Sequence, residues 1–191
     1  MTATDPINGR EIALDVLLEV LEQGKMSHLV LGDALSKYQY LKKQDRAFIT
    51  RLVEGTLSYV LQLDWVINRF SSVKAAKMKP LIRTLLRMSA YQLFYMDRVP
   101  DSAAINEAVK LAKKRKFGSL SGFVNGVLRT LSREKDGIQF PSQEIRLSIP
   151  EWILARWRRE YGEETAERIA SSFLCSRPLS VRVNHSRASE E

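Results

Sequence analysis

Apolar residues recur every three or four positions through the first two thirds of the chain, which is the spacing of amphipathic α-helices. The first such stretch follows Asn8, a residue type that caps helix starts, and precedes Gly24, a residue type that ends helices. A second stretch covers 42–61, and a short apolar helix follows it around 65–70. The side chains predicted to face a core in these helices are Ile12, Ala13, Val16, Leu17, Val20, Leu21, Phe48, Leu52, Val53, Leu57, Trp65, Val66, Ile67 and Phe70.

Pro80 suits the first turn of another helix, because its fixed φ is helical and the first-turn N–H groups have no helical acceptor. Arg83 and Arg87 lie one turn apart on this helix. We expect it to be the central helix of the fold. Its core candidates are Leu81, Ile82, Leu85, Leu86, Leu93 and Phe94.

The stretch 99–133 predicts a helical hairpin. Pro100 and the two residues after it are placed to begin a helix that ends in a dense basic run, where cations complement the negative helix C-terminus. Gly118 then lets the chain turn into a second helix. The buried stripes are Ala104, Ile105, Ala108, Val109 and Ala112 in the first helix, and Phe123, Val124, Val127, Leu128 and Leu131 in the second.

The pattern predicts an all-α domain over 1–136, because no long alternation of apolar and polar residues occurs before 179–184. Residues 137–191 are predicted to form a connector of two amphipathic helices followed by one strand. A lone strand is marginally stable, so we expect it to begin a domain whose remainder is missing. Docking on the helices or pairing with another molecule are the alternatives.

Charge and composition narrow the functional classes. The excess of Lys and Arg over Asp and Glu is +8, which is typical of a protein that meets a polyanion, although a solvated basic surface gives the same balance. With Cys175 as the only cysteine and only two histidines, neither an intrachain disulfide nor a metal site is expected. The polar N-terminus and the lack of a ~20-residue apolar run predict a cytoplasmic protein without membrane contact.

The stretch VPDSAAINEAVKLAKKRKFGSLSGFVNGVLR resembles the C-terminal helical hairpin of NusB-like RNA-binding domains, and the NEAV and FVNGVLR elements are its most specific parts. The later elements IPEWILARWRREYGEETAERIA and RPLSVRVN are similar to the linker region of the RsmB (Sun/Fmu) type of bacterial ribosomal RNA cytosine-C5 methyltransferase. The resemblance implies a NusB-like all-α domain, a short helical connector and the first strand of a truncated catalytic region.

The resemblance also implies a function. The domain would seat small-subunit ribosomal RNA for a catalytic methyltransferase domain in cis that this chain lacks. S-adenosylmethionine is implied as the cofactor of the full-length protein, whereas no cofactor is expected in this chain, which has no glycine-rich loop after a strand. Such enzymes use two cysteines, and Cys175 lacks their sequence context, so we expect it to be an ordinary packed residue and no catalytic residue to be present.

The candidate RNA-binding residues are mainly cations. The basic run at the end of the hairpin's first helix could contact phosphates, or it could be a solvated helix terminus. The aromatic ring of the FVNG element could stack on an unpaired base or pack in the core. The candidates are Arg10, Lys42, Lys43, Arg46, Lys113, Lys114, Arg115, Lys116, Phe123, Arg129, Arg182 and Asn184.

Some of these candidates rest on the resemblance alone. NusB carries a richer arginine cluster around the position of Arg10, which leaves the basic face at 42–46 as an alternative. Arg182 and Asn184 match the RVN element near the RNA path of RsmB. Two tryptophans of the connector are expected to pack rather than to stack on bases.

Two other functions remain open at this point. The domain could act alone as a NusB-like transcription antitermination or ribosome assembly factor. It could instead be an intramolecular scaffold that packs on a catalytic domain and has little RNA contact. The oligomeric state is left open by the sequence.

Overall fold

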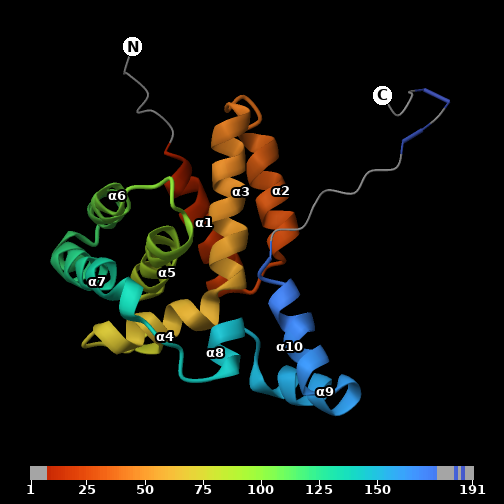
Figure 1. The fold of residues 1–191 in the computed structure, drawn as a ribbon. Coiled ribbons are helices and arrows are strands. Elements are labelled where there is room, and N and C mark those ends of the chain that lie inside the picture. Colours follow the sequence, from red (N-terminus) through yellow and green to blue (C-terminus); the bar gives the residue numbers. More distant parts are fainter. Residues whose placement is uncertain (1–7, 176–182, 185, 188–191) are drawn as a thin grey trace.

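The computed structural model describes residues 8–175, 183–184 and 186–187, and within these ranges α-helices joined by short turns make up the fold (Figure 1). The prediction of an all-α fold is confirmed for the described residues. The helices are α1 (Gly9–Gln23), α2 (Ser27–Lys37), α3 (Lys43–Ser58), α4 (Val60–Phe70), α5 (Pro80–Tyr95), α6 (Asp101–Lys114), α7 (Ser121–Glu134), α8 (Gln143–Leu147), α9 (Glu151–Tyr161) and α10 (Glu163–Ser172), with 3-10 turns at Ala75–Lys77, Gly118–Leu120 and Lys135–Gly137.

Helix α5 is the central helix, as predicted. It begins with Pro80 in its first turn, and it packs against α1, α3, α4, α6 and α7. Leu85, Leu86 and Met88 are fully buried in it. Because neighbours cover α5 on nearly every side, its apolar side chains join those of the other five helices in one core.

Helix α1 begins and ends where the sequence predicts. The side chain of Asn8 accepts a hydrogen bond of 3.0 Å from the backbone N–H of Arg10, and Gly24 has a left-handed backbone with φ of 71°. Toward its C-terminal end, Glu22 forms an ion pair with Arg83 of α5. Burial raises the pKa of Glu22, whereas the hydrogen bonds and the charge of Arg83 lower it. The lowering outweighs the effect of burial, so the pKa of Glu22 lies below its usual value.

Two stretches of the helical prediction differ from the structure. The stretch 42–61 is interrupted at Tyr59, where α3 ends and α4 begins, so the single predicted helix is wrong at that point. Helix α2 has no counterpart in the prediction, because its apolar positions form no clear stripe. In the structure α2 buries only Leu31, and Leu29 is exposed.

The α6–α7 hairpin is confirmed, but its turn is made by a different residue. Lys116 carries the left-handed backbone, with φ of 65°, and Gly118 begins a 3-10 helix instead. The chain reverses before the glycine because the backbone N–H of Phe117 reaches back to the carbonyl of Ala112 at 2.8 Å.

Helices α8 to α10 form a small second cluster built on Leu147, Leu154 and Ala170. This cluster docks on α4. The side-chain amide of Gln62 donates to the carbonyl of Arg146 at 2.5 Å, and the backbone N–H of Leu61 donates to the Ser148 hydroxyl at 3.2 Å. The connector is therefore held against the bundle by hydrogen bonds to buried or half-buried groups of α4.

The connector departs from expectation at two side chains. Trp157 stacks on Phe173, as packing predicts. Trp152 is 71% exposed, because no other element of the described ranges covers it. Cys175 is exposed rather than packed. The predicted strand at 179–184 lies outside the described residues except for its last two positions, which belong to neither a helix nor a strand.

Candidate nucleic-acid interface

The basic run at the end of α6 is partly neutralised by α1. Lys114 forms an ion pair of 2.6 Å with Glu11, and Arg115 forms one of 2.6 Å with Asp15 and one of 3.3 Å with Glu11. The run is dense in the sequence, but the structure places two acidic side chains directly on it. These ion pairs join α1 to α6. We call the four residues that form them the α1–α6 clasp: Glu11, Asp15, Lys114 and Arg115.

The clasp has a clear electrostatic signature. Burial lowers the pKa of Arg115, but the hydrogen bonds and charges of Asp15 and Glu11 raise it above its usual value. The charge of Arg115 is therefore satisfied within the chain. Lys113 and Lys116 are exposed, and no ion pair of theirs is found among the described residues, so they are the cations of this run that remain available to a polyanion.

Arg10 is held at the junction of four helices. Its Nε donates to Oε1 of Gln92 on α5 at 2.7 Å, and its guanidinium lies 5.1 Å from the ring centre of Phe48 on α3. Burial lowers the pKa of Arg10, and the charge of Glu107 on α6 opposes that shift. Arg10 is thus half-buried and fixed by protein contacts.

The start of α3 carries cations of a different kind. Lys42 and Lys43 are exposed, and neither forms an ion pair in the part of the chain that the structure describes. Arg46, one turn later, is half-buried, and no hydrogen-bond partner of its Nε is found among the residues that the structure describes. We call Lys42, Lys43 and Arg46 the α3 basic face.

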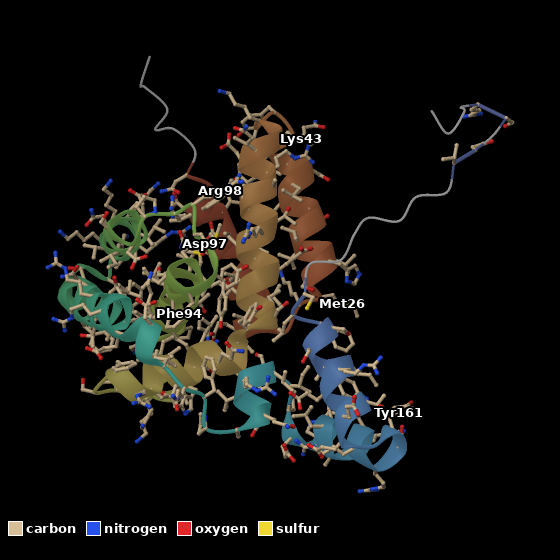
Figure 2. The ribbon with its side chains drawn as sticks, viewed as in Figure 1. Met26, Lys43, Phe94, Asp97, Arg98 and Tyr161 are labelled. Atoms are coloured by element: carbon tan, nitrogen blue, oxygen red, sulfur yellow. The ribbon has the colours of Figure 1, made fainter. Side chains whose placement is uncertain are left out.

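An additional cation lies toward the same end of the molecule as this face (Figure 2). Figure 2 shows Lys43 and Arg98 toward the same end of the molecule, the end at which α3 begins. Arg98 is exposed in the turn between α5 and α6. It is absent from the predicted site residues, because a lone arginine in a turn carries no periodic signal. Its place at this end follows from the packing of α5 beside α3, where Arg51 donates to the carbonyl of Tyr95 at 3.0 Å.

The other predicted site residues lie elsewhere. Phe123 is half-buried and packs against the core, while Arg129 is exposed on α7. Asn184 is exposed, and its side chain accepts a hydrogen bond of 2.6 Å from the Ser186 hydroxyl. Arg182 lies outside the described residues. Arg10 therefore lies beside Phe48 of α3 and next to Glu11 of the clasp, whereas Phe123 and Arg129 lie on α7.

Other kinds of site find little support. Among the described residues, no three histidine, cysteine or acidic side chains are grouped closely enough to hold a metal ion. None of the helices in that part of the chain has the length and apolar character needed to cross a membrane.

Comparison with known proteins identifies the family. Residues 7–133 match the model of the NusB family. The chain belongs to the NusB family. Residues 149–191 match the ferredoxin-like domain of RsmF/B-like methyltransferases, so the resemblance found in the sequence is confirmed in both parts.

The curated relatives are longer proteins. The chain is 38% identical over 185 residues to the probable ribosomal RNA small subunit methyltransferase B of Bacillus subtilis, covering 94% of this chain and 41% of the relative. It is 30% identical over 186 residues to ribosomal RNA small subunit methyltransferase B of Escherichia coli O1:K1, covering 96% of this chain and 42% of the relative. The chain thus spans about two fifths of their length.

Solved structures confirm the fold. Thermotoga maritima NusB superposes with a TM-score of 0.61 at 21% identity, covering 66% of this chain and 89% of that one. The structure of PH0851 superposes with a TM-score of 0.67 at 18% identity, covering 89% of this chain and 39% of that one. At these identities the likeness establishes the all-α NusB fold.

Proposed function

We propose that this chain is an RNA-binding domain that seats small-subunit ribosomal RNA for cytosine-C5 methylation. The methylation itself would be carried out in cis by a catalytic domain that the longer relatives include, with S-adenosylmethionine as the methyl donor. The observation that carries the proposal is the α3 basic face on a NusB-family bundle, whose two lysines are exposed and form no ion pair within the described part of the chain.

The electrostatics favour this face over the α6 run. Lysines that make no ion pair can replace the counterions of RNA phosphates without first breaking an internal ion pair. On α6, by contrast, Lys114 and Arg115 already contact acidic residues of α1. The α3 basic face is therefore the principal phosphate contact, with Lys113 and Lys116 as a secondary one.

The division of labour within the chain is part of the proposal. Residues 1–136 form the RNA-binding domain, and 137–191 connect it to the catalytic region. The separate apolar cluster of α8 to α10 supports this boundary, since it has its own buried leucines. A cytoplasmic location, where ribosomal RNA is processed in bacteria, belongs to the same proposal.

The test is a fluorescence-anisotropy titration of the full chain with a small-subunit ribosomal RNA hairpin across a salt series. The variant Lys42→Glu/Lys43→Glu is compared with the matched variant Lys113→Glu/Lys116→Glu, and duplex DNA of equal length serves as control. Glutamate is favourable near a helix N-terminus, so the α3 variant should stay folded.

We expect the hairpin to bind more tightly than the DNA, and the α3 variant to lose more affinity than the α6 variant. The slope of log K against log salt should also become shallower by about 0.7–0.9 for each phosphate that the variant no longer neutralises. Failure of both nucleic acids to bind at about 50 mM salt would overturn the proposal and favour an intramolecular scaffold. Equal affinity of the native protein and the α3 variant would overturn the assignment of the face.

A further inference from the structure

A groove of about 630 Å³ runs along the outer face of α3 beside the end of α10. Its lining contains none of the residues of the α3 basic face, but it follows that face along the same helix. Side chains at 43, 47 and 51 follow one another at four-residue spacing, and position 47 already lines the groove. The groove therefore begins about 6 Å along the helix from position 43, at 1.5 Å per residue. The residues of its lining that could contact a ligand through a charge or an aromatic ring are Arg51, Tyr59, Tyr91, Tyr95 and Phe173.

The floor of the groove is made by the close approach of Tyr91 to α3. A Cβ atom at Gly55 would lie 2.0 Å from Cζ of Tyr91, so only glycine lets the ring rest directly on the helix backbone. Tyr91 is 5% exposed, and no hydrogen-bond partner of its hydroxyl is found among the described residues. The hydroxyl oxygen is not one of the fully buried side-chain atoms that lack a hydrogen bond, so it reaches the solvent of the groove and can offer a polar contact to a ligand there.

The wall opposite α3 is held in place by the tyrosines. Tyr59 stacks on Tyr95 with ring centres 4.0 Å apart, and its hydroxyl donates to the carbonyl of Leu174 at 3.4 Å. This bond ties the segment after α10 to the start of α4. Phe173 remains 54% exposed, although it also stacks on Trp157. The groove therefore has a fixed aromatic edge that reaches solvent.

The rim of the groove carries one cation and one acid. Arg51 is exposed and donates one N–H to the carbonyl of Tyr95, which leaves other guanidinium N–H groups to contact an anion. Glu54 lies one turn later on the same face. The cation is on the side of the α3 basic face, and the acid is on the far side, so an anionic chain would enter from the start of α3.

We propose that this groove binds one unpaired nucleotide of the RNA. Its base stacks on Phe173, the edge of the base hydrogen-bonds to the Tyr91 hydroxyl, and its phosphate pairs with Arg51. This inference rests on the proposed function, and it adds single-stranded RNA as the substrate class. Aromatic faces beside a basic track are the usual means of holding unpaired bases, whereas duplex RNA keeps its bases stacked.

The test uses the full chain and a short single-stranded RNA that carries 2-aminopurine at one position. A second oligonucleotide of the same sequence has an abasic site there. Tyr91→Phe removes only the hydroxyl, and Phe173→Leu removes the ring but keeps an apolar side chain. Their matched controls are Tyr161→Phe and Trp152→Leu, which change exposed aromatic residues of α9.

We expect Phe173→Leu to weaken binding of the 2-aminopurine RNA about fivefold to tenfold, and Tyr91→Phe to weaken it about twofold to fivefold. Neither variant should change binding of the abasic RNA, and the controls should behave like the native protein. If Phe173→Leu unfolds by circular dichroism, Tyr91→Phe still decides the result, because it leaves the packing of the ring in place.

Cys175 supplies an independent readout at the groove. It is the only cysteine of the chain, it is exposed, and it lines the groove. Bound 2-aminopurine RNA should slow its alkylation by a maleimide, and the abasic RNA should slow it less.

The outcomes separate this inference from the proposed function. Salt-dependent RNA binding that is insensitive to the abasic site, to both groove variants and to Cys175 alkylation would overturn the groove and leave the proposed function standing. Absence of any RNA binding would overturn both. Protection of Cys175 that persists in Lys42→Glu/Lys43→Glu would support the groove and contradict the α3 basic face.

Discussion

The α1–α6 clasp and the α3 basic face contain similar residue types but use them differently. On α6, Lys114 and Arg115 contact acidic side chains of α1, and their charges hold two helices together. At the start of α3, Lys42 and Lys43 contact no acid among the described residues. The run at the end of α6 is denser in cations, but fewer of its charges are available to RNA phosphates, because acids about a hundred positions away in the sequence neutralise them.

The largest expected effect concerns the clasp as a structural contact. Arg115→Ala removes the ion pairs to Asp15 and Glu11. Asp15 loses its partner in the clasp, whereas Glu11 keeps its ion pair with Lys114. We expect the free energy of unfolding to fall by about 1–2 kcal/mol, which allows for partial exposure of the pair. Urea denaturation of the variant measures this. The control Lys113→Ala should change stability by less than about 0.5 kcal/mol, and an equal decrease in both would contradict the comparison.

The second prediction tests whether the clasp masks charge. Glu11→Gln/Asp15→Asn removes the two acids and frees the cations that they neutralise. We expect affinity for the ribosomal RNA hairpin to rise about twofold to fivefold at low salt, and the gain to disappear as salt screens it. The anisotropy titration with the hairpin measures this. A fall in affinity in a protein that is still folded would show that the clasp itself positions the RNA.

The third prediction concerns the loss of stability at low pH through Glu107 of α6, which accepts a hydrogen bond from Asn8 at the start of α1. The hydrogen bond from Lys110 lowers the pKa of Glu107, and burial raises it. The hydrogen bond from Asn8 also lowers it, so the pKa of Glu107 lies below its usual value of 4.5. A depressed carboxyl pKa stabilises the fold above pH 4.5, and that contribution is lost as the pH falls through the folded-state value. The urea midpoint should therefore drop between pH 5 and about pH 3 more in the native protein than in Glu107→Gln. If the urea midpoints of the two proteins fall equally with pH, Glu107 does not stabilise the contact between α1 and α6.

The smallest expected effect separates charge from backbone strain at Lys116. This residue has a left-handed backbone that favours glycine. Lys116→Gly should raise the free energy of unfolding by about 0.5 kcal/mol and weaken RNA binding only slightly, because one secondary cation is removed. Thermal denaturation checks the first part, and Lys116→Ala is the control, since it removes the charge without relieving the strain. A stabilised Lys116→Ala would show that strain is not the cause.

Local signals predicted the parts of the fold that depend on neighbouring residues in the sequence. Asn8, Gly24 and Pro80 mark helix ends because capping and φ restrictions act within one turn, and the structure confirms all three. Helix α2 could not be predicted, since it buries only Leu31 and its pattern is weak. The break at Tyr59 could not be predicted either, because the apolar spacing continues through it.

Burial of single residues was harder to predict than secondary structure. Trp152 and Cys175 were expected to pack, yet both are exposed, because burial depends on which other element covers them. The candidate site shows the same limit. The sequence singled out Lys42, Lys43 and Arg46 as cations, but it could not show which cations are paired.

The sequence by itself determined the helical fold class, the helix ends with clear caps, the resemblance to the NusB family and the positive net charge. Each of these follows from residue type and short-range spacing. Only the tertiary structure decided that Glu11 and Asp15 neutralise the end of α6, that Arg10 is held against Gln92, and that Gly55 and Tyr91 shape a groove beside Phe173. Those contacts join residues from different helices, and their geometry is set by how the helices pack around α5.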